Sequence, residues 1–134
     1  MNLKKDESCL IITDSKLRHI GFALFKNSLK ITKRAKLITI PIPETHGSEP
    51  PKKVAKEMLN YNIILMPTTK SLSHTRARKN ASSTGARIAS MPGITEGMMK
   101  RDLNVDFNKI KQHNKKFISK LNSKNIIRIT TKLG

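Results

Sequence analysis

The sequence predicts an open α/β domain in which a mostly parallel, five-stranded sheet carries helices on both faces, a Rossmann-like or flavodoxin-like arrangement. Short apolar runs of the kind buried inside a sheet alternate along the chain with segments of helical periodicity. Turn residues and helix-capping residues separate these runs from one another. Connections of the strand–helix–strand type are right-handed, so consecutive strands are expected to run parallel.

Residues 1–7 form a polar N-terminal tail in this prediction, and residues 8–134 form a single domain. The first buried strand is CLIIT, residues 9–13, and Asp14 and Ser15 are candidate N-caps for the helix after it. That helix is indicated by apolar residues at helical spacing, namely Leu17, Ile20 and Leu24.

Three more strands are predicted, at residues 37–42, 62–67 and 86–90. Pro41 lies in the first of them, which favours a position at the edge of the sheet. Pro50 and Pro51 are typical of a helix start, and the following helix repeats apolar residues every four positions.

The C-terminal part of the chain predicts an amphipathic helix and then the fifth strand. Asp106 is a candidate N-cap, and the apolar face of the helix comprises Phe107, Ile110, Phe117, Ile118 and Leu121. Residues 125–131, NIIRITT, supply the fifth strand. The chain ends directly after this strand, with no closing helix.

Charge is the most unusual feature of the composition, since 27 Lys and Arg stand against nine Asp and Glu, for a formal net charge of +18. A polyanionic partner, a coding bias towards lysine and an acidic partner domain would each explain this excess. Aromatic residues make up 4% of the chain, which gives almost no stacking platform for single-stranded nucleic acid. Binding to nucleic acid would then be non-specific and sensitive to salt.

The single cysteine, Cys9, opens a buried strand and has no partner for an internal disulfide, so a structural thiol is expected. Apolar runs in the sequence are too short for a membrane span, so the protein is predicted to be cytoplasmic, without a membrane partner.

The stretch from Thr68 to Arg101 is the most specific part of the sequence. Its segments SLSHTRAR, residues 71–78, and GARIASMPGITEGMMKR, residues 85–101, resemble the amino-terminal domain of the leucyl-aminopeptidase-like (aminopeptidase T type) metallopeptidases, whose relatives include a dihydroxypyridine ring-cleaving dioxygenase. The resemblance covers nearly the whole chain and is weakest before Pro50.

The resemblance implies a scaffold domain without catalytic residues, because the metal ligands of that family lie in its carboxy-terminal domain. In that family the chain crosses into the catalytic domain at about the end of the predicted fifth strand, so the resemblance also implies a boundary to a catalytic domain outside this chain. Divalent metal ions are therefore expected only in a full-length relative, and a catalytic domain or a second copy is the expected partner. The positions that match the family motif, or that could face a ligand or interface, are Ser71, His74, Thr75, Arg76, Arg87, Met91, Pro92, Gly93 and Thr95.

Two interpretations of the His74 region remain open. With Thr68, Thr69, Ser71, Thr75 and Arg76 it could form a helix start that binds an anion at the carboxyl side of the sheet. Alternatively, Ser71, Ser73 and Thr75 cap the helix, and His74 holds the loop or contacts the next domain.

The function hypothesis is an amino-terminal scaffold, as a fragment or split copy, of such a metallopeptidase, inactive on its own. The alternative is a stand-alone basic α/β module that binds nucleic acid or anionic ligands. An exposed apolar patch around the last helix would favour the first, whereas one continuous positive face would favour the second.

Overall fold

The computed structural model describes residues 1–102, 105–121, 126 and 128–133. It divides into two units, Met1–Met99 and Lys100–Gly134. The strands of the first unit are β1 Cys9–Asp14, β2 Ala35–Ile40, β3 Ile63–Met66 and β4 Arg87–Ser90. Its helices are α1 Arg18–Leu29, α2 Lys52–Glu57, the short 3-10 helix η1 Met58–Asn60 and α3 Arg76–Ser83. Helix α4 spans Glu96–Asp102, and α5 spans Phe107–Ile118.

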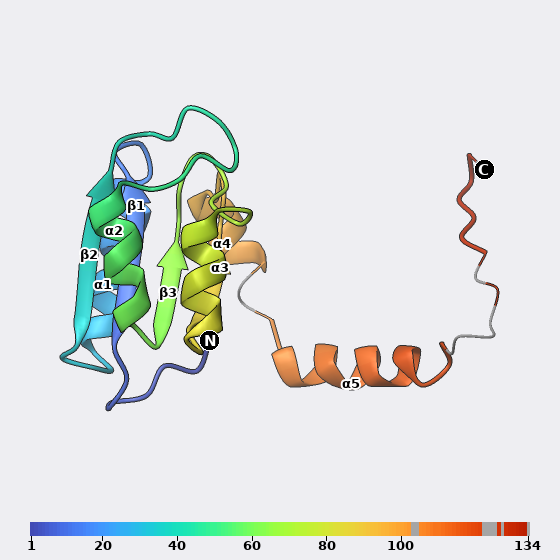
Figure 1. The fold of residues 1–134 in the computed structure, drawn as a ribbon. Helices are drawn as coiled ribbons and strands as arrows, with labels where there is room; N and C mark the ends of the chain where they lie inside the picture. The colour runs from blue at the N-terminus through green and yellow to red at the C-terminus, as the bar shows by residue number, and fades with distance from the viewer. Residues whose placement is uncertain (103–104, 122–125, 127, 134) are drawn as a thin grey trace. The chain divides into compact units, whose positions relative to one another are not determined.

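The four described strands form one all-parallel sheet in the order β2-β1-β3-β4 (Figure 1). Strand β1 is central and buried along its whole length, as expected for CLIIT. Its first residue, Cys9, pairs with Ala35 on one side and with Ile63 on the other. The α/β class and the parallel sheet are therefore as the sequence predicts.

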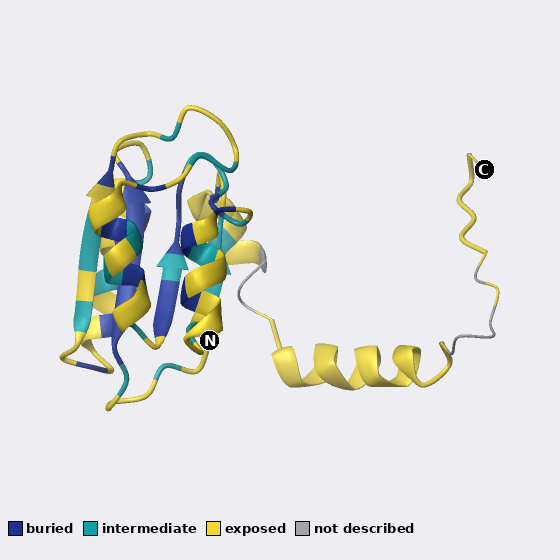
Figure 2. Ribbon diagram, viewed as in Figure 1, coloured by how far each residue is buried: buried dark blue, intermediate teal, exposed yellow. Residues whose placement is uncertain are grey.

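Helices cover both faces of this sheet. Leu24 and Phe25 of α1 pack against Cys9, Ile11 and Ile63 on one face. On the other face, α2, η1 and α3 pack against alternate residues of β1 and β3, through Val54, Met58, Ala77 and Ala81. Figure 2 shows the resulting pattern of buried strands beneath helices whose outward sides are exposed.

Gly21 allows α1 to approach the sheet closely. A Cβ atom at this position would lie 2.7 Å from both Cβ and Cγ2 of Thr13 in β1. Since real side chains do not approach that closely, the absence of a side chain at Gly21 sets the distance between α1 and β1.

The predicted element boundaries are correct for most elements, with β2 as the main exception. It begins at Ala35 inside the predicted loop, and it ends before Pro41, at the edge of the sheet. The predicted fifth strand is not confirmed. Residues 125 and 127 lie outside the described part of the chain, and residues 126 and 128–131 are not in a strand.

The N-terminal segment, predicted as a polar tail, is hydrogen-bonded to two strands at the amino end of the sheet. The Glu7 carboxylate accepts hydrogen bonds of 2.9 Å from both guanidinium NH groups of Arg87 and from the Lys4 backbone N–H. The Arg34 guanidinium, just before β2, donates to the Asp6 carbonyl oxygen at 3.0 Å. The Arg87 guanidinium, followed by the Lys4 amide, holds the pKa of Glu7 at about 2, below its ordinary value of 4.5.

The second unit contains α5, which Asp106 caps as predicted by accepting hydrogen bonds from the N–H groups of Asn108 and Lys109. None of the residues of α5 is buried. Its apolar face is exposed, with 63% of Phe107, 69% of Phe117 and 65% of Ile118 accessible to solvent.

Within the described residues, every helix is too short or too polar to cross a lipid bilayer.

Candidate functional site at the carboxyl edge of the sheet

The strand order places a topological switch point between β1 and β3. The chain passes from β1 outward to β2 and then returns to the other side of β1 to form β3 and β4. In open α/β sheets, ligands bind at the carboxyl ends of the strands where the order reverses. The residues that end β1 and β3, together with the loops after them, therefore form the candidate site.

Asp14 is the central side chain of this edge. It ends β1 and is fully buried. Its Oδ1 accepts hydrogen bonds of 3.1 Å from the backbone N–H groups of Lys16 and Leu17 and from the Thr69 hydroxyl. Its Oδ2 accepts a short hydrogen bond from the Thr69 backbone N–H. The carboxylate thus joins the loop after β1 to the loop after β3, and its hydrogen-bonding capacity is used within the fold.

The loop between β2 and α2 supplies a second carboxylate to the same edge. Oε1 of Glu49 lies 2.5 Å from the backbone N of Arg76, and its Oε2 lies 3.2 Å from that of Ala77. These are N–H groups of the first turn of α3, where a helix attracts negative charge. A carboxylate of the chain itself therefore occupies the helix start that one of the two interpretations assigned to the binding of an external anion.

His46 and Gly47 connect the same two loops. The Ser71 backbone N–H donates to Nδ1 of His46 at 3.0 Å, and the Gly47 N–H donates to the Ser71 carbonyl oxygen at 2.8 Å. Because Nδ1 is an acceptor here, the imidazole carries its proton on Nε2. Both loops are held in place at the carboxyl edge by these bonds.

Thr75 is the N-cap of α3. Its hydroxyl accepts from the Arg78 N–H at 3.1 Å and donates to the Leu72 carbonyl oxygen at 2.8 Å. Ser71 Oγ instead accepts from the Ser73 N–H in the preceding turn. The capping role is therefore confirmed for Thr75, whereas Ser71 and Ser73 lie before the helix.

His74 is exposed, and its ring has no hydrogen bond or ion pair with any residue that the structure describes. It lies just before α3, whose first turn binds the Glu49 carboxylate, but the His74 ring takes no part in the hydrogen bonds of the carboxyl edge. Contact with a ligand or with another domain therefore stays a prediction for this histidine.

The motif residues after β4 form the predicted turn. The Met91 N–H donates to the Met66 carbonyl oxygen, and the N–H of Gly93, at φ +64°, donates to that of Thr68 at 2.9 Å. Pro92 lies exposed between them, and the Thr95 hydroxyl accepts from the Met98 N–H at the start of α4. These bonds attach the turn to the carboxyl end of β3.

Arg87 lies apart from the other motif residues. It begins β4 at the amino end of the sheet, where it pairs with Glu7, whereas Met91 to Thr95 follow the carboxyl end. The sequence motif thus contains residues from opposite edges of the sheet, and the structure brings together only those at the carboxyl edge.

Sequence reasoning missed three residues of this edge, Asp14 as a clamp between loops, His46 and Glu49. Asp14 was expected to cap α1, and it does bind the turn before that helix, but its bonds to Thr69 span 55 positions. No local pattern marks such partners. The one available signal was the position of an aspartate directly after a buried strand.

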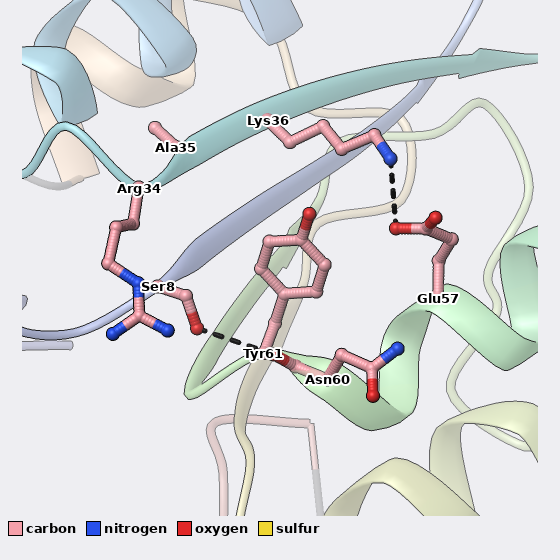
Figure 3. Close-up of a pocket in the computed structure, with 7 residues that line it drawn as sticks. All are labelled: Ser8, Arg34, Ala35, Lys36, Glu57, Asn60 and Tyr61. Carbon is pink, nitrogen blue, oxygen red and sulfur yellow. Dashed lines mark hydrogen bonds and ion pairs between the residues drawn. The ribbon is translucent and has the colours of Figure 1, made fainter.

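A separate pocket of about 370 Å³ opens at the amino end of the sheet (Figure 3). The Tyr61 ring stands between Lys36 and Asn60, and the Lys36 ammonium donates to Glu57 Oε2 at 2.9 Å. Burial, reinforced by the Glu57 carboxylate, raises the pKa of Tyr61, while the hydrogen bond to Glu57 raises the pKa of Lys36. Lys36 and Glu57 therefore neutralise each other, while Arg34, which also lines the pocket, donates to a backbone carbonyl.

Neither edge brings together a nucleophile, a base and an orienting group. At the carboxyl edge, the groups that could serve are bonded to backbone N–H groups of the loops. Among the described residues, no group of three or more His, Cys, Asp or Glu side chains is placed to hold a metal ion. What this edge does is fix three loops relative to the sheet.

In the comparisons with known proteins, no family model, no curated protein and no solved structure matches the chain.

Proposed function

We propose that this chain is the amino-terminal scaffold domain of a leucyl-aminopeptidase-like metallopeptidase and that it is inactive on its own. The proposal rests on the resemblance of residues 71–78 and 85–101 to that family. In the whole enzyme, a two-metal site on another domain would activate water for the removal of amino-terminal residues from peptides. The present domain would support that site as a scaffold, a dimer contact or a wall of the cavity.

The exposed apolar residues of the second unit support the proposal of a partner domain. The apolar face of α5 is exposed, with 63% to 69% of Phe107, Phe117 and Ile118 open to solvent. Ile126 and Ile129, from the predicted fifth strand, are 99% and 86% exposed. An apolar surface of this kind is typical of an interface with another domain or chain. In the complete protein, we propose, residues 125–131 form the fifth strand of a flavodoxin-like sheet.

The carboxyl edge is consistent with a supporting role. Asp14, His46 and Glu49 accept hydrogen bonds from backbone N–H groups, which connects the loops to one another and restrains them. A domain that shapes a neighbouring active site needs rigid loops more than reactive side chains. His74 is an exposed polar group on this edge whose ring has no partner among the described residues, so it is a candidate contact with such a neighbour.

The intact mass of the native gene product, measured from the source cells, is the first test. We expect a mass well above the 15.1 kDa of this chain. A native mass of 15.1 kDa would contradict the fragment hypothesis and leave a stand-alone domain.

The second test measures activity and the state of α5. The longer product should release amino-terminal residues from a peptide panel with added divalent metal, and a chelator should abolish the release. Amide hydrogens of residues 107–118 should exchange rapidly in the present chain and slowly in the longer product, because burial protects helical hydrogen bonds. A folded, metal-loaded longer product with no release on the panel would refute the peptidase assignment, and assay of ring cleavage would then test the dioxygenase relative.

A further inference from the structure

Helices α2 and α3 present a surface that differs from the rest of the fold. They lie beside each other on the same face of the sheet, held there by the buried side chains of Val54, Ala77 and Ala81 (Figure 1). Their outward sides carry five exposed cationic residues, which we call the basic face: Lys52, Lys53, Lys56, Arg76 and Lys79. Arg78, half-buried between them, uses its guanidinium to bind Ser73 O and Ser82 Oγ.

The charge of the basic face is not neutralised by ion pairs within the described part of the chain. The ion pairs of the first unit join His19 to Glu96, Lys36 to Glu57 and Arg87 to Glu7, and none includes a residue of the basic face. The two acidic residues near the face are engaged elsewhere, since Glu57 pairs with Lys36 and the Glu49 carboxylate binds backbone N–H groups. The positive charge is therefore left for an external partner.

The composition of the face distinguishes among anionic partners. In the interfaces between proteins, lysine is depleted and large apolar side chains form the core. Helices that lie on membranes insert Leu, Phe or Trp into the lipid. The only valine of α2 and both alanines of α3 face the sheet, so the exposed sides of these two helices offer no large apolar group. The adjoining η1 exposes one such side chain, Leu59, at 42%. Surfaces that bind nucleic acid, in contrast, are polar and strongly positive.

The low aromatic content also separates duplex from single-stranded nucleic acid. Single strands are bound by stacking of their bases on aromatic side chains, and neither α2 nor α3 contains an aromatic residue. The phosphates of a duplex require only cations held at the protein surface.

We propose that the basic face of α2 and α3 binds the phosphate backbone of a nucleic acid duplex without reading its sequence. This inference stands independently of the peptidase assignment, because it uses only residues of the first unit. Each lysine or arginine that neutralises a phosphate releases condensed counterions, so affinity falls with salt by about 0.9 logarithmic units per contact for each tenfold rise in salt. Five contacts would contribute a slope of about −4.5, which weakens binding roughly 500-fold between about 50 and 200 mM salt.

The test compares the full chain with two variants of identical net charge. The face variant carries K52Q, K53Q, K56Q, R76Q and K79Q. The control variant removes four lysines and one arginine that are equally exposed elsewhere in the first unit, through K5Q, K16Q, R18Q, K26Q and K33Q. Both changes lower the formal net charge of +18 by five and leave the C-terminal cations in place. Affinity for a fluorescent duplex of about 20 base pairs is measured by anisotropy across the salt range.

We expect the face variant to lose about four units of the salt slope, and the control variant to lose less than about one. Circular dichroism should show both variants folded, since none of the ten replaced side chains makes a hydrogen bond or ion pair within the described residues. Their one other contact is the Lys26 ammonium over the Phe22 ring. The smaller variants K52Q/K53Q/K56Q and R76Q/K79Q should each lose part of the salt slope. They test the same surface if the variant with five substitutions does not fold.

An equal loss of salt slope in the face variant and the control variant would overturn the proposal, because binding would then depend on the total charge and not on this surface. The proposal also fails if the wild-type chain does not retain the duplex at about 50 mM salt. Retention on phosphatidylserine vesicles without retention of the duplex would replace the nucleic acid with a membrane surface as the partner.

Discussion

Replacing Asp14 with asparagine tests whether the buried carboxylate holds the carboxyl edge together. The asparagine oxygen can keep the bonds from the Lys16 and Leu17 N–H groups, but its NH₂ group then faces the Thr69 backbone N–H, where Oδ2 now accepts. Two donors would oppose each other at that contact. The change loses a charge-assisted hydrogen bond and leaves a part-buried N–H unpaired, so we expect a loss of about 2–4 kcal/mol in the free energy of unfolding.

The assay is urea unfolding of the wild type, D14N and a control, E44Q. Glu44 is exposed and makes no hydrogen bond or ion pair with the described residues. E44Q therefore removes one negative charge, as D14N does, without removing a hydrogen bond between loops. With a slope of about 1.5 kcal/mol/M, a loss of 3 kcal/mol lowers the unfolding midpoint by about 2 M. E44Q should stay within about 0.5 kcal/mol of the wild type.

Hydrogen exchange gives a local measurement of the same contact. The Thr69 amide should exchange faster in D14N, because its acceptor is gone, while amides in the middle of β1 keep their relative protection. If D14N and E44Q had equal stability, or if Thr69 exchanged no faster, Asp14 would not be the clamp that its contacts indicate.

Three further predictions concern other parts of the first unit. In E7Q, stability should fall below that of the wild type above pH 4.5, and the gap should close as pH falls towards about 2, because the folded-state pKa of Glu7 lies below its ordinary value of 4.5. A constant gap in thermal melts across this range would contradict the ion pair. G21A should destabilise the protein by about 1–2 kcal/mol in urea unfolding, since overpacking against β1 outweighs the better helix propensity of alanine. The matched change G97A, in α4 with its nearest atom 3.9 Å away, should be neutral or stabilising, and equal effects of the two would refute the close approach of α1. The Cys9 thiol, whose pKa is raised by burial, should react with a disulfide reagent only at the rate of unfolding, and prompt labelling of the native chain would exclude its burial.

The elements that sequence predicted well are those specified by neighbouring residues. The run of apolar residues in β1 indicates burial on both faces, and the structure buries every residue of it. The φ of Gly85 is +92°, as a helix that must reverse into a strand requires. Thr95 and Asp106 cap the helices that follow them. For the turn and the two caps, the determining atoms lie within four residues of one another.

The start of α3 shows where local pattern is insufficient. Ser71, Ser73 and Thr75 each have a hydroxyl that could cap a helix, and sequence alone does not choose among them. Ser71 lies before Leu72, which is fully buried in the core. Ser73 and Thr75 both follow Leu72, but the Ser73 N–H donates to Ser71 Oγ within the preceding turn, whereas the Thr75 hydroxyl accepts from the Arg78 N–H and is the N-cap.

The carboxyl edge could not be predicted because its bonds connect distant positions. Glu49 lies 27 residues before Arg76, and Asp14 lies 55 residues before Thr69. Such pairs leave no periodic trace in the sequence, and each carboxylate taken alone resembles an ordinary loop or turn residue. The sequence therefore identified the edge where a ligand would bind, but not that the chain's own carboxylates occupy it.

The charge and the exposed apolar surface of this chain call for different partners, and they lie on different helices. Helix α5 exposes Phe107, Phe117 and Ile118, and burial of such side chains contributes about 1.5–3 kcal/mol each, which favours packing of another domain on this helix. Helices α2 and α3 expose cations without large apolar side chains, so an interface there would gain little from burial and much from counterion release. A partner domain at α5 and a polyanion at the basic face are thus compatible in chemistry, and each can be removed by substitutions that leave the other surface intact.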